Sequence, residues 1–137
     1  MMKSLKILLI EDDIIEVMKL NRVVSSLKLK HKIIEANNGE EALTILEQNT
    51  IIPDIILLDL NMPKLSGIEF LSILKKSKDF NCIPTIILTT SNNSRDILKC
   101  FEIGVSGYVI KPLKYEDYVY KIEKLLAYWS INEIVEK

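Results

Sequence analysis

The sequence has few residues that bind soft metals or build disulfide frameworks. Its 137 residues include two cysteines, Cys82 and Cys100, and one histidine, His31. The two cysteines do not have the spacing of a zinc site, so we expect both to be free thiols. His31 stands in a polar stretch, and we interpret it as a surface loop residue rather than a ligand. A site for a soft metal is therefore not expected.

The sequence also lacks a long apolar run and an excess of one charge. No apolar run approaches the roughly 20 residues that a membrane-spanning helix needs. The short apolar stretch near the N-terminus runs directly into acids, unlike a signal peptide. Eighteen basic and nineteen acidic residues give a formal net charge of −1, which implies no bulk attraction to nucleic acid or to an anionic membrane. We therefore expect a cytoplasmic protein that contacts neither membrane nor nucleic acid directly.

Linkers, internal repeats and low-complexity segments are missing as well, and apolar runs alternate with helical patterns instead. The chain length fits one domain over residues 1–137, with a core over about 5–128 and a short helical extension over 129–137. The apolar runs predict buried strands at 5–10, 32–36, 54–58, 85–88 and 108–110. Five helical patterns follow them. This alternation predicts an α/β fold, a doubly wound five-stranded parallel sheet with five helices.

Two of the predicted helices carry many large apolar side chains. In the fourth helix, Ile97, Leu98 and Phe101 share one face, which we interpret as core packing. The fifth carries more large groups than one buried face can take, namely Tyr118, Tyr120, Leu125, Tyr128 and Trp129. A homodimer or a partner contact through the fourth and fifth helices, with Tyr120 and Trp129 on its surface, is the resulting hypothesis.

Polar side chains follow the predicted strands at the points where the strands end. These residues are Glu11, Asp12, Asp13, Asp59, Asn61, Thr89, Thr90 and Lys111. Because the carboxyl ends of parallel strands meet at one edge of the sheet, we expect a shared site there. Oxygen-only ligands suit Mg²⁺, and a cation, a hydroxyl and a lysine together can hold a phosphoryl group. A strand-end aspartate could then form an aspartyl phosphate, although each residue taken singly also fits a structural role.

The segments LLIEDD, NGEEAL, PDIILLDLNMPKLSG, PTIILTT and GVSGYVIKP follow one another in the chain. In this order they resemble the receiver domains of two-component response regulators, over about residues 5–128. The resemblance implies a flavodoxin-like fold with strand order 2-1-3-4-5. The sequence around ILTTSNN and the late aromatic residue Trp129 resemble the corresponding features of stand-alone receivers that work beside phytochrome-type kinases. Only nine residues, WSINEIVEK, follow the predicted fifth helix, so we expect action through changing partners rather than through an attached output domain.

The resemblance implies a phosphorylation site and a metal site. Asp59 would be the phosphoacceptor, taking its phosphoryl group from a sensor histidine kinase or a phosphotransfer protein. Glu11 and Asp12 would hold Mg²⁺ together with Asp59 and the backbone carbonyl of Asn61, with Asp12 as a direct ligand and Glu11 acting through water. The protein would then catalyse only its own phosphorylation and dephosphorylation and would not otherwise be an enzyme.

The resemblance also implies a switch. The Thr89 hydroxyl would move toward the phosphoryl group, and Lys111 would pair with the phosphoryl oxygens. Tyr108 would turn inward, which changes the surface of the fourth helix, the fifth strand and the fifth helix. The Lys111–Pro112 bond would be cis. Thr90 is bulkier than the residue in many relatives, so we expect it to narrow the access of water to the site.

The residues where the acids meet the first predicted helix need separate interpretations. Ile14 and Ile15 lie off the core stripe, so either one tucks under a loop or both form a docking patch for the kinase. Asp13 and Glu16 have the spacing of a capping box. We therefore expect Asp12→Ala to abolish Mg²⁺-dependent phosphorylation and Asp13→Ala to cost mainly stability, about 0.5–2 kcal/mol.

Two other functions compete with the phosphoacceptor switch. One is a flavodoxin-like module that binds a small phosphorylated cofactor such as FMN. The acids of EDDII after the first strand would repel a phosphate in that case, unless a metal intervened. The other is a pseudo-receiver that binds partners without being phosphorylated, and the intact set of Glu11, Asp12, Asp59, Thr89 and Lys111 argues against it.

Overall fold

A parallel sheet of five strands lies at the centre of the computed structural model, which describes residues 3–135. Its strands are β1 (Lys6–Ile10), β2 (Lys32–Ala36), β3 (Ile55–Leu58), β4 (Thr85–Thr89) and β5 (Gly107–Ile110). They lie in the order β2-β1-β3-β4-β5, and every neighbouring pair is parallel. The predicted fold class and strand order are confirmed.

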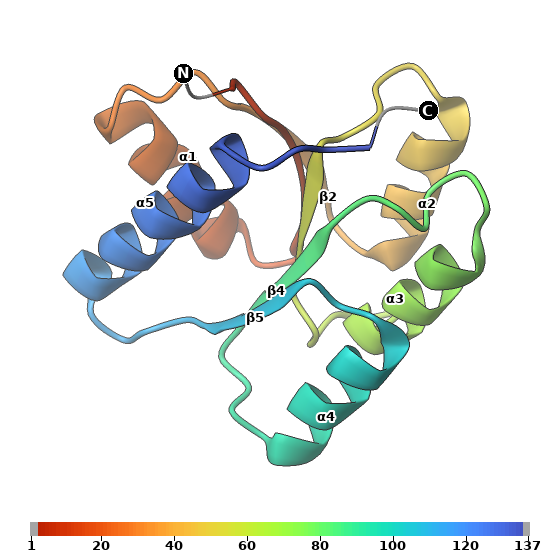
Figure 1. Ribbon diagram of the computed structural model, residues 1–137. Coiled ribbons are helices and arrows are strands. Elements are labelled where there is room, and N and C mark those ends of the chain that lie inside the picture. The colour runs from red at the N-terminus through yellow and green to blue at the C-terminus, as the bar shows by residue number, and fades with distance from the viewer. Residues whose placement is uncertain (1–2, 136–137) are drawn as a thin grey trace.

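Five helices cover the two faces of the sheet. They are α1 (Ile14–Ser26), α2 (Gly39–Gln48), α3 (Gly67–Lys76), α4 (Ser94–Ile103) and α5 (Tyr115–Ser130). Helices α1 and α5 lie side by side on one face, and α2, α3 and α4 lie on the other (Figure 1). Within residues 3–135, no helix is both long and apolar enough to cross a membrane.

Alternate residues of each central strand enter separate cores. In β1, Leu8 and Ile10 pack among α2 and α3, while Ile7 and Leu9 pack among α1 and α5. This follows from the two-residue period of a strand, whose successive side chains point to opposite faces. Because both faces are covered, β3 is buried at every position, and its sequence shows no polar alternation.

The start of α1 confirms one part of the predicted capping box and contradicts the other. The Asp13 carboxylate accepts a hydrogen bond from the Ile15 amide at 2.9 Å, so Asp13 is the N-cap. Glu16, however, does not turn back to the Asp13 amide. Its carboxylate oxygens pair with Lys19 and Lys111 instead, at 3.1 Å each. Two ammonium groups within reach compete successfully with one backbone amide for this carboxylate.

The helical extension predicted over residues 129–137 is wrong for most of its described part. Helix α5 ends at Ser130, and residues 131–135 form a turn and irregular chain; residues 136–137 lie outside the described part. The side-chain amide of Asn132 donates to the Tyr128 carbonyl at 2.7 Å. A continuing helix would give that carbonyl to the Asn132 backbone amide, which bonds Trp129 instead.

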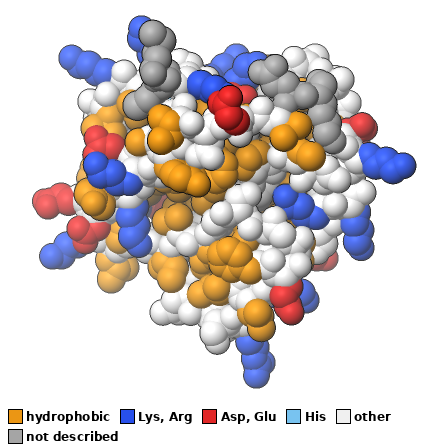
Figure 2. Space-filling model, viewed as in Figure 1, with side chains coloured by type: hydrophobic (Ala, Val, Ile, Leu, Met, Phe, Trp, Pro, Cys, Tyr) orange, Lys and Arg blue, Asp and Glu red, His pale blue; other side chains and the backbone are white. Residues whose placement is uncertain are grey.

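The predicted core stripe of α4 is also wrong. Leu98 and Phe101 keep 61% and 53% of their surface exposed, and the buried residue of this helix is Cys100. In α5, Tyr118 and Leu125 are buried, whereas Tyr120 and Tyr128 are more than half exposed. On the face viewed in Figure 2, apolar side chains gather across the middle and charged side chains surround them. The surplus of large apolar groups expected on the fifth helix is therefore present at the surface.

A glycine holds α3 against the end of β3. A Cβ on Gly67 would come within 2.4 Å of the Asp59 carbonyl oxygen and 2.7 Å of the Leu60 Cα. Both are backbone atoms, so they cannot move aside as a flexible side chain would. The Gly67 amide also donates to the Leu60 carbonyl at 3.1 Å. The absence of a side chain at Gly67 thus lets the start of α3 lie against the backbone that carries Asp59.

Candidate functional site

The carboxyl ends of the strands bring most of the predicted site residues around one hollow. This hollow has a volume of about 420 Å³. The predicted residues that line it are Glu11, Asp12, Asp59, Asn61, Thr90 and Lys111. Thr89 at the end of β4 is fully buried beside them. The sheet edge chosen from the sequence is therefore where the polar groups meet.

Three carboxylates form the centre of the site. Glu11 and Asp12 follow β1, and Asp59 follows β3, which is the neighbour of β1 in the sheet. The Asp59 amide donates to the Ile10 carbonyl at 3.0 Å, which extends the pairing of the two strands to the site. One carboxylate oxygen from each of the three acids lies within 4.8 Å of the other two. This arrangement of hard oxygen donors fits a divalent cation such as Mg²⁺ or Mn²⁺.

Burial makes the negative charge of this cluster costly. The pKa of Asp59 is raised, first by burial and also by Asp12, against the opposing effects of Lys111 and the Thr89 hydroxyl. Burial likewise raises the pKa of Glu11 to about 7, although Lys111 acts in the other direction. The carboxylates thus hold more negative charge than the surrounding protein neutralises, and a bound cation would relieve that excess.

Lys111 at the end of β5 is the buried cation of the site, with 9% of its surface exposed. Its ammonium donates to Glu11 Oε1 at 2.6 Å and lies 3.1 Å from Glu16 Oε1. Burial acts to lower the pKa of Lys111, but the hydrogen bond and charge of Glu11 outweigh it and raise the pKa. Lys111 therefore remains charged and faces the acidic cluster.

Glu16 is a site residue that the sequence did not reveal. It lines the hollow from the first turn of α1, as Lys19 does from the next turn. Burial acts to raise its pKa, but Lys111 and Lys19 outweigh burial and lower it, so Glu16 stays ionised. Its spacing from Asp13 fits a capping box, which predicts a contact within α1. The sequence gives no sign of the ion pair with Lys111, which lies far away in the chain.

A second polar network joins Thr89 to Tyr108 through Ser91. The Thr89 hydroxyl accepts from the Ser91 amide at 3.3 Å, and the Tyr108 hydroxyl donates to the Ser91 carbonyl at 2.9 Å. The Ser91 hydroxyl in turn donates to Asp96 of α4 at 2.8 Å. Ser91 was not identified from the sequence. It connects the two predicted switch residues and links both to α4.

Exposed apolar side chains follow the acids along the chain, and Leu113 is an apolar residue that lines the hollow. Ile14 and Ile15 are 71% and 64% exposed, so neither tucks under a loop, and that alternative is wrong. Met18 on the next turn of α1 and Leu113 after β5 are exposed as well. Thr90 is exposed where it lines the hollow. At the far end of α5, Trp129 is partly buried against the core shared by α1 and α5.

The prediction of a cis bond between Lys111 and Pro112 is wrong. This bond is trans, as are all peptide bonds of residues 3–135. A prolyl bond prefers trans by only about 0.5–1 kcal/mol, so sequence alone gives a weak basis for the choice. The amide of Lys111 donates to the Thr89 carbonyl at 2.7 Å and holds the start of this loop to β4.

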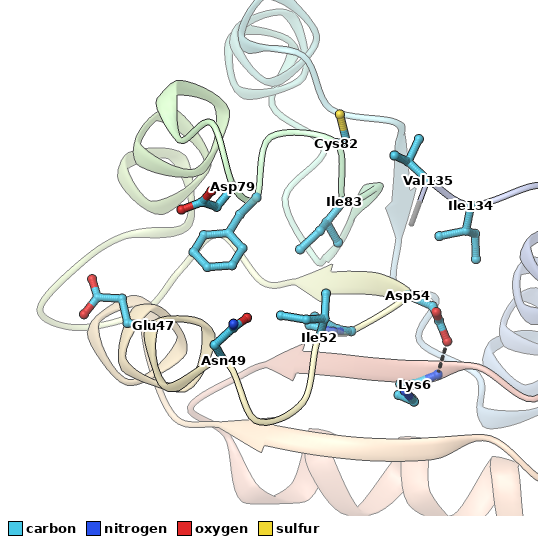
Figure 3. Close-up of a pocket in the computed structure, with 12 residues that line it drawn as sticks. Lys6, Glu47, Asn49, Ile52, Asp54, Asp79, Cys82, Ile83, Ile134 and Val135 are labelled. Carbon is cyan, nitrogen blue, oxygen red and sulfur yellow. Dashed lines mark hydrogen bonds between the residues drawn. The ribbon is translucent and has the colours of Figure 1, made fainter. Parts of the chain in front are cut away.

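A larger hollow, of about 660 Å³, lies at the opposite edge of the sheet (Figure 3). Lys6 and Asp54, beside the starts of β1 and β3, line it, and the Lys6 amide donates to Asp54 at 2.7 Å. Ile83 and Ile52 point into it in Figure 3. It contains none of the residues predicted for the site. Volume alone would select this hollow, whereas the convergent carboxylates and lysine select the smaller one.

Comparisons with known proteins identify a family that covers most of the chain. Residues 7–123 match the family model described as the response regulator receiver domain. The probable methanogenesis regulatory protein FilR2 of Methanothrix harundinacea is 35% identical over 127 residues, covering 90% of this chain and 82% of that protein. Response regulator Rcp1 of Synechocystis is 32% identical over 128 residues, covering 90% and 87%.

Two solved structures are similar over nearly the whole chain. The phosphorylated cyanobacterial phytochrome response regulator RcpA has a TM-score of 0.91 and 28% identity, covering 98% of this chain and 100% of that one. The Mn²⁺-bound form of Rcp1 has a TM-score of 0.88 and 29% identity, with the same coverage.

Without divalent cations, Asp59→Asn should make the folded protein more stable. The substitution keeps the size of the side chain and removes a buried charge that its surroundings disfavour. We expect the free energy of unfolding to rise at pH 8 by about 1–3 kcal/mol, the usual cost of an uncompensated buried polar group. Urea unfolding in EDTA measures the difference.

The same gain should be smaller at pH 5. The pKa values of Asp59 and Glu11 are raised in the folded state, that of Glu11 to about 7. Both carboxyl groups are therefore neutral at low pH, where there is no charge penalty. The penalty grows as the pH rises through the raised pKa values. Asp79→Asn, at an exposed position outside the site, serves as the control. Equal stability of Asp59→Asn and wild type at pH 8 would contradict the view that the cluster is held at a cost.

Proposed function

The chain belongs to the response regulator receiver domain family, and we propose that it is a phosphoacceptor switch whose Asp59 takes a phosphoryl group from a histidine kinase or phosphotransfer protein. As a receiver domain it is a signalling phosphoacceptor rather than a conventional enzyme. One observation carries the proposal: a buried aspartate lies in a carboxylate cluster beside a buried lysine. We propose that residues 1–137 form one such domain.

The acceptor step requires an ionised Asp59. A carboxylate oxygen of Asp59 attacks the phosphorus, the bond from phosphorus to the donor breaks, and its electron pair leaves with the donor. Glu11, Asp12, Asp59 and the backbone carbonyl of Asn61 would hold Mg²⁺, which when bound supplies positive charge to the phosphoryl oxygens. The Lys111 ammonium and the Thr89 hydroxyl contact the remaining oxygens. The Mn²⁺-bound form of Rcp1 supports a cation in this role.

The switch step runs through Ser91. When the Thr89 hydroxyl turns to the phosphoryl group, it gives up the hydrogen bond from the Ser91 amide. The loop that carries Ser91 then shifts, and the hydrogen bond from Tyr108 to the Ser91 carbonyl breaks, so the tyrosine can turn inward. Because Ser91 also bonds Asp96, α4 moves with the loop. The outcome is a population shift between two packings of α4, β5 and α5.

The competing functions fit the site less well. A cofactor phosphate at the end of β1 would meet Glu11 and Asp12, whose charges repel it. A receiver that is never phosphorylated would have no need to keep Asp59, Thr89 and Lys111 together at the cost described above. Thr90, exposed at the hollow, narrows the path of water to Asp59 and so slows loss of the phosphoryl group.

Intact-mass measurement after incubation with acetyl phosphate and Mg²⁺ tests the proposal. The wild type should gain the mass of one phosphoryl group, and the adduct should be labile, as acyl phosphates are. Asp59→Asn should gain none, and neither should Asp12→Ala. The proposal fails if the wild type gains no labile adduct from acetyl phosphate or from histidine kinases, or if Asp59→Asn gains one equally well.

We propose the exposed apolar group of Ile14, Ile15, Met18 and Leu113 as the docking patch for the phosphoryl donor. The double substitution Ile14→Ser and Ile15→Ser should slow transfer from a histidine kinase that phosphorylates the wild type, by about tenfold, the effect of losing roughly 1.4 kcal/mol of contact. Transfer from acetyl phosphate should not change, because that donor needs no protein contact.

Ile73→Ser is a matched control, because Ile73 is an exposed isoleucine on α3, away from the hollow. Kinetics of phosphorylation by both donors give the comparison. If the double substitution slowed transfer from the kinase and from acetyl phosphate equally, its effect would lie in the phosphorylation site itself. That result would contradict the docking patch.

Self-association through α4 and α5 is a second partner proposal. Leu98 and Phe101 on α4, and Tyr120 on α5, leave more than half of their surfaces exposed, as a self-complementary interface requires. Sedimentation velocity should show a concentration-dependent dimer of the phosphorylated protein that Leu98→Ser and Phe101→Ser abolish. Monomers at every concentration, with and without phosphoryl groups, would exclude this interface.

A further inference from the structure

Two carboxylates hold Lys111, and only one of them belongs to the acidic cluster. Glu11 lies within the group of three acids that can share a cation, and it accepts from Lys111 at 2.6 Å. Glu16 lies outside that group, on α1, and its Oε1 is 3.1 Å from the same ammonium. The lysine is therefore shared between an acid that serves the cation and an acid that does not.

Glu11 cannot serve both positive charges equally. When Glu11 acts as a cation ligand, its carboxylate electrons are drawn toward a charge of +2, and its hydrogen bond to the ammonium weakens. The ammonium also lies close enough to such a cation to be repelled by it. Lys111 then needs another anion, or it leaves the site for solvent. The remaining carboxylate in contact with it is that of Glu16.

Glu16 is itself fixed from its other side. The Lys19 ammonium donates to Glu16 Oε2 at 3.1 Å, three residues along the same helix. That ammonium lies 4.4 Å from the ring centre of Tyr118, which is fully buried between α5 and the sheet. One oxygen of Glu16 is thus held by Lys19, and the other is left facing Lys111. A carboxylate held in this way provides a fixed anchor for the lysine.

We propose that Glu16 is a positioning residue, whose carboxylate keeps the Lys111 ammonium beside the acidic cluster while Glu11 binds the cation. The proposal rests on the proposed function and adds a residue to it. In the free protein, Lys111 is held by both glutamates. In the cation-bound protein, Glu16 alone holds it, with its third hydrogen directed toward the oxygens of a phosphoryl group on Asp59. Without Glu16, the same state leaves the buried ammonium with no carboxylate hydrogen-bonded to it.

A double-mutant cycle on cation affinity tests this role without any phosphoryl donor. Isothermal titration calorimetry with Mg²⁺ compares the wild type, Glu16→Gln, Lys111→Met and the double variant. Glu16→Gln should raise the dissociation constant about fivefold when Lys111 is present, and less than twofold in the Lys111→Met background. The control Glu123→Gln, at an exposed position on α5, should leave the dissociation constant unchanged both with Lys111 and with Lys111→Met.

An equal effect of Glu16→Gln in both backgrounds would overturn the proposal, because it would show that Glu16 acts on the cation only through its charge. Nuclear magnetic resonance of ¹⁵N-lysine protein gives a second readout. With Mg²⁺ present, the Lys111 ammonium signal should persist in the wild type and be lost by exchange with water in Glu16→Gln. An unchanged signal in Glu16→Gln would also overturn the role.

These outcomes are separable from the fate of the proposed function. A wild type that binds Mg²⁺ and is phosphorylated on Asp59, yet shows no coupling between Glu16 and Lys111, would retain the function and lose the positioning role. Coupling in a wild type that accepts no phosphoryl group would retain the Glu16 contact and reject the function.

Discussion

Three carboxylates held together at the ends of two neighbouring strands are the constraint on which the rest of the structure depends. The strand order places β1 and β3 side by side, so the acids that follow them must meet. Burial raises the pKa values of Glu11 and Asp59, which means that the folded chain maintains their charge against a penalty. The large apolar cores on both faces of the sheet supply the stability that offsets it.

The other features of this edge are arranged around that charge. Lys111 supplies one buried positive charge, too little for three acids, and a bound divalent cation would supply the rest. Gly67 allows the backbone of α3 to lie directly against the backbone of Asp59 and Leu60. The adjacent acids differ in role because their positions differ: Asp13 caps α1, while Glu16, one turn later, holds the lysine.

The fold and the location of the site could be predicted because both depend on local sequence patterns that have one structural meaning in a parallel sheet. Unbroken apolar runs predict strands buried on both faces, and residues that follow such strands must share an edge. The partner of Glu16 could not be predicted, because a glutamate at that spacing can turn back to its own helix or forward to a lysine, and only the packed structure decides. The exposure of Leu98 and Phe101 was missed because an apolar stripe does not reveal how much of a helix its neighbours cover. The end of α5 coincides with a side-chain hydrogen bond from Asn132 to the Tyr128 carbonyl, which the apolar pattern of the helix does not reveal.

The central claim is that Asp59 accepts a phosphoryl group within a cluster that a divalent cation neutralises. Borohydride reduction of the protein after treatment with acetyl phosphate tests it most directly, because reduction converts an aspartyl phosphate into homoserine, which peptide mass spectrometry can place in the sequence. The account predicts homoserine at position 59 when Mg²⁺ is present and none when EDTA removes it. Homoserine at another aspartate, or at position 59 irrespective of Mg²⁺, would contradict the account.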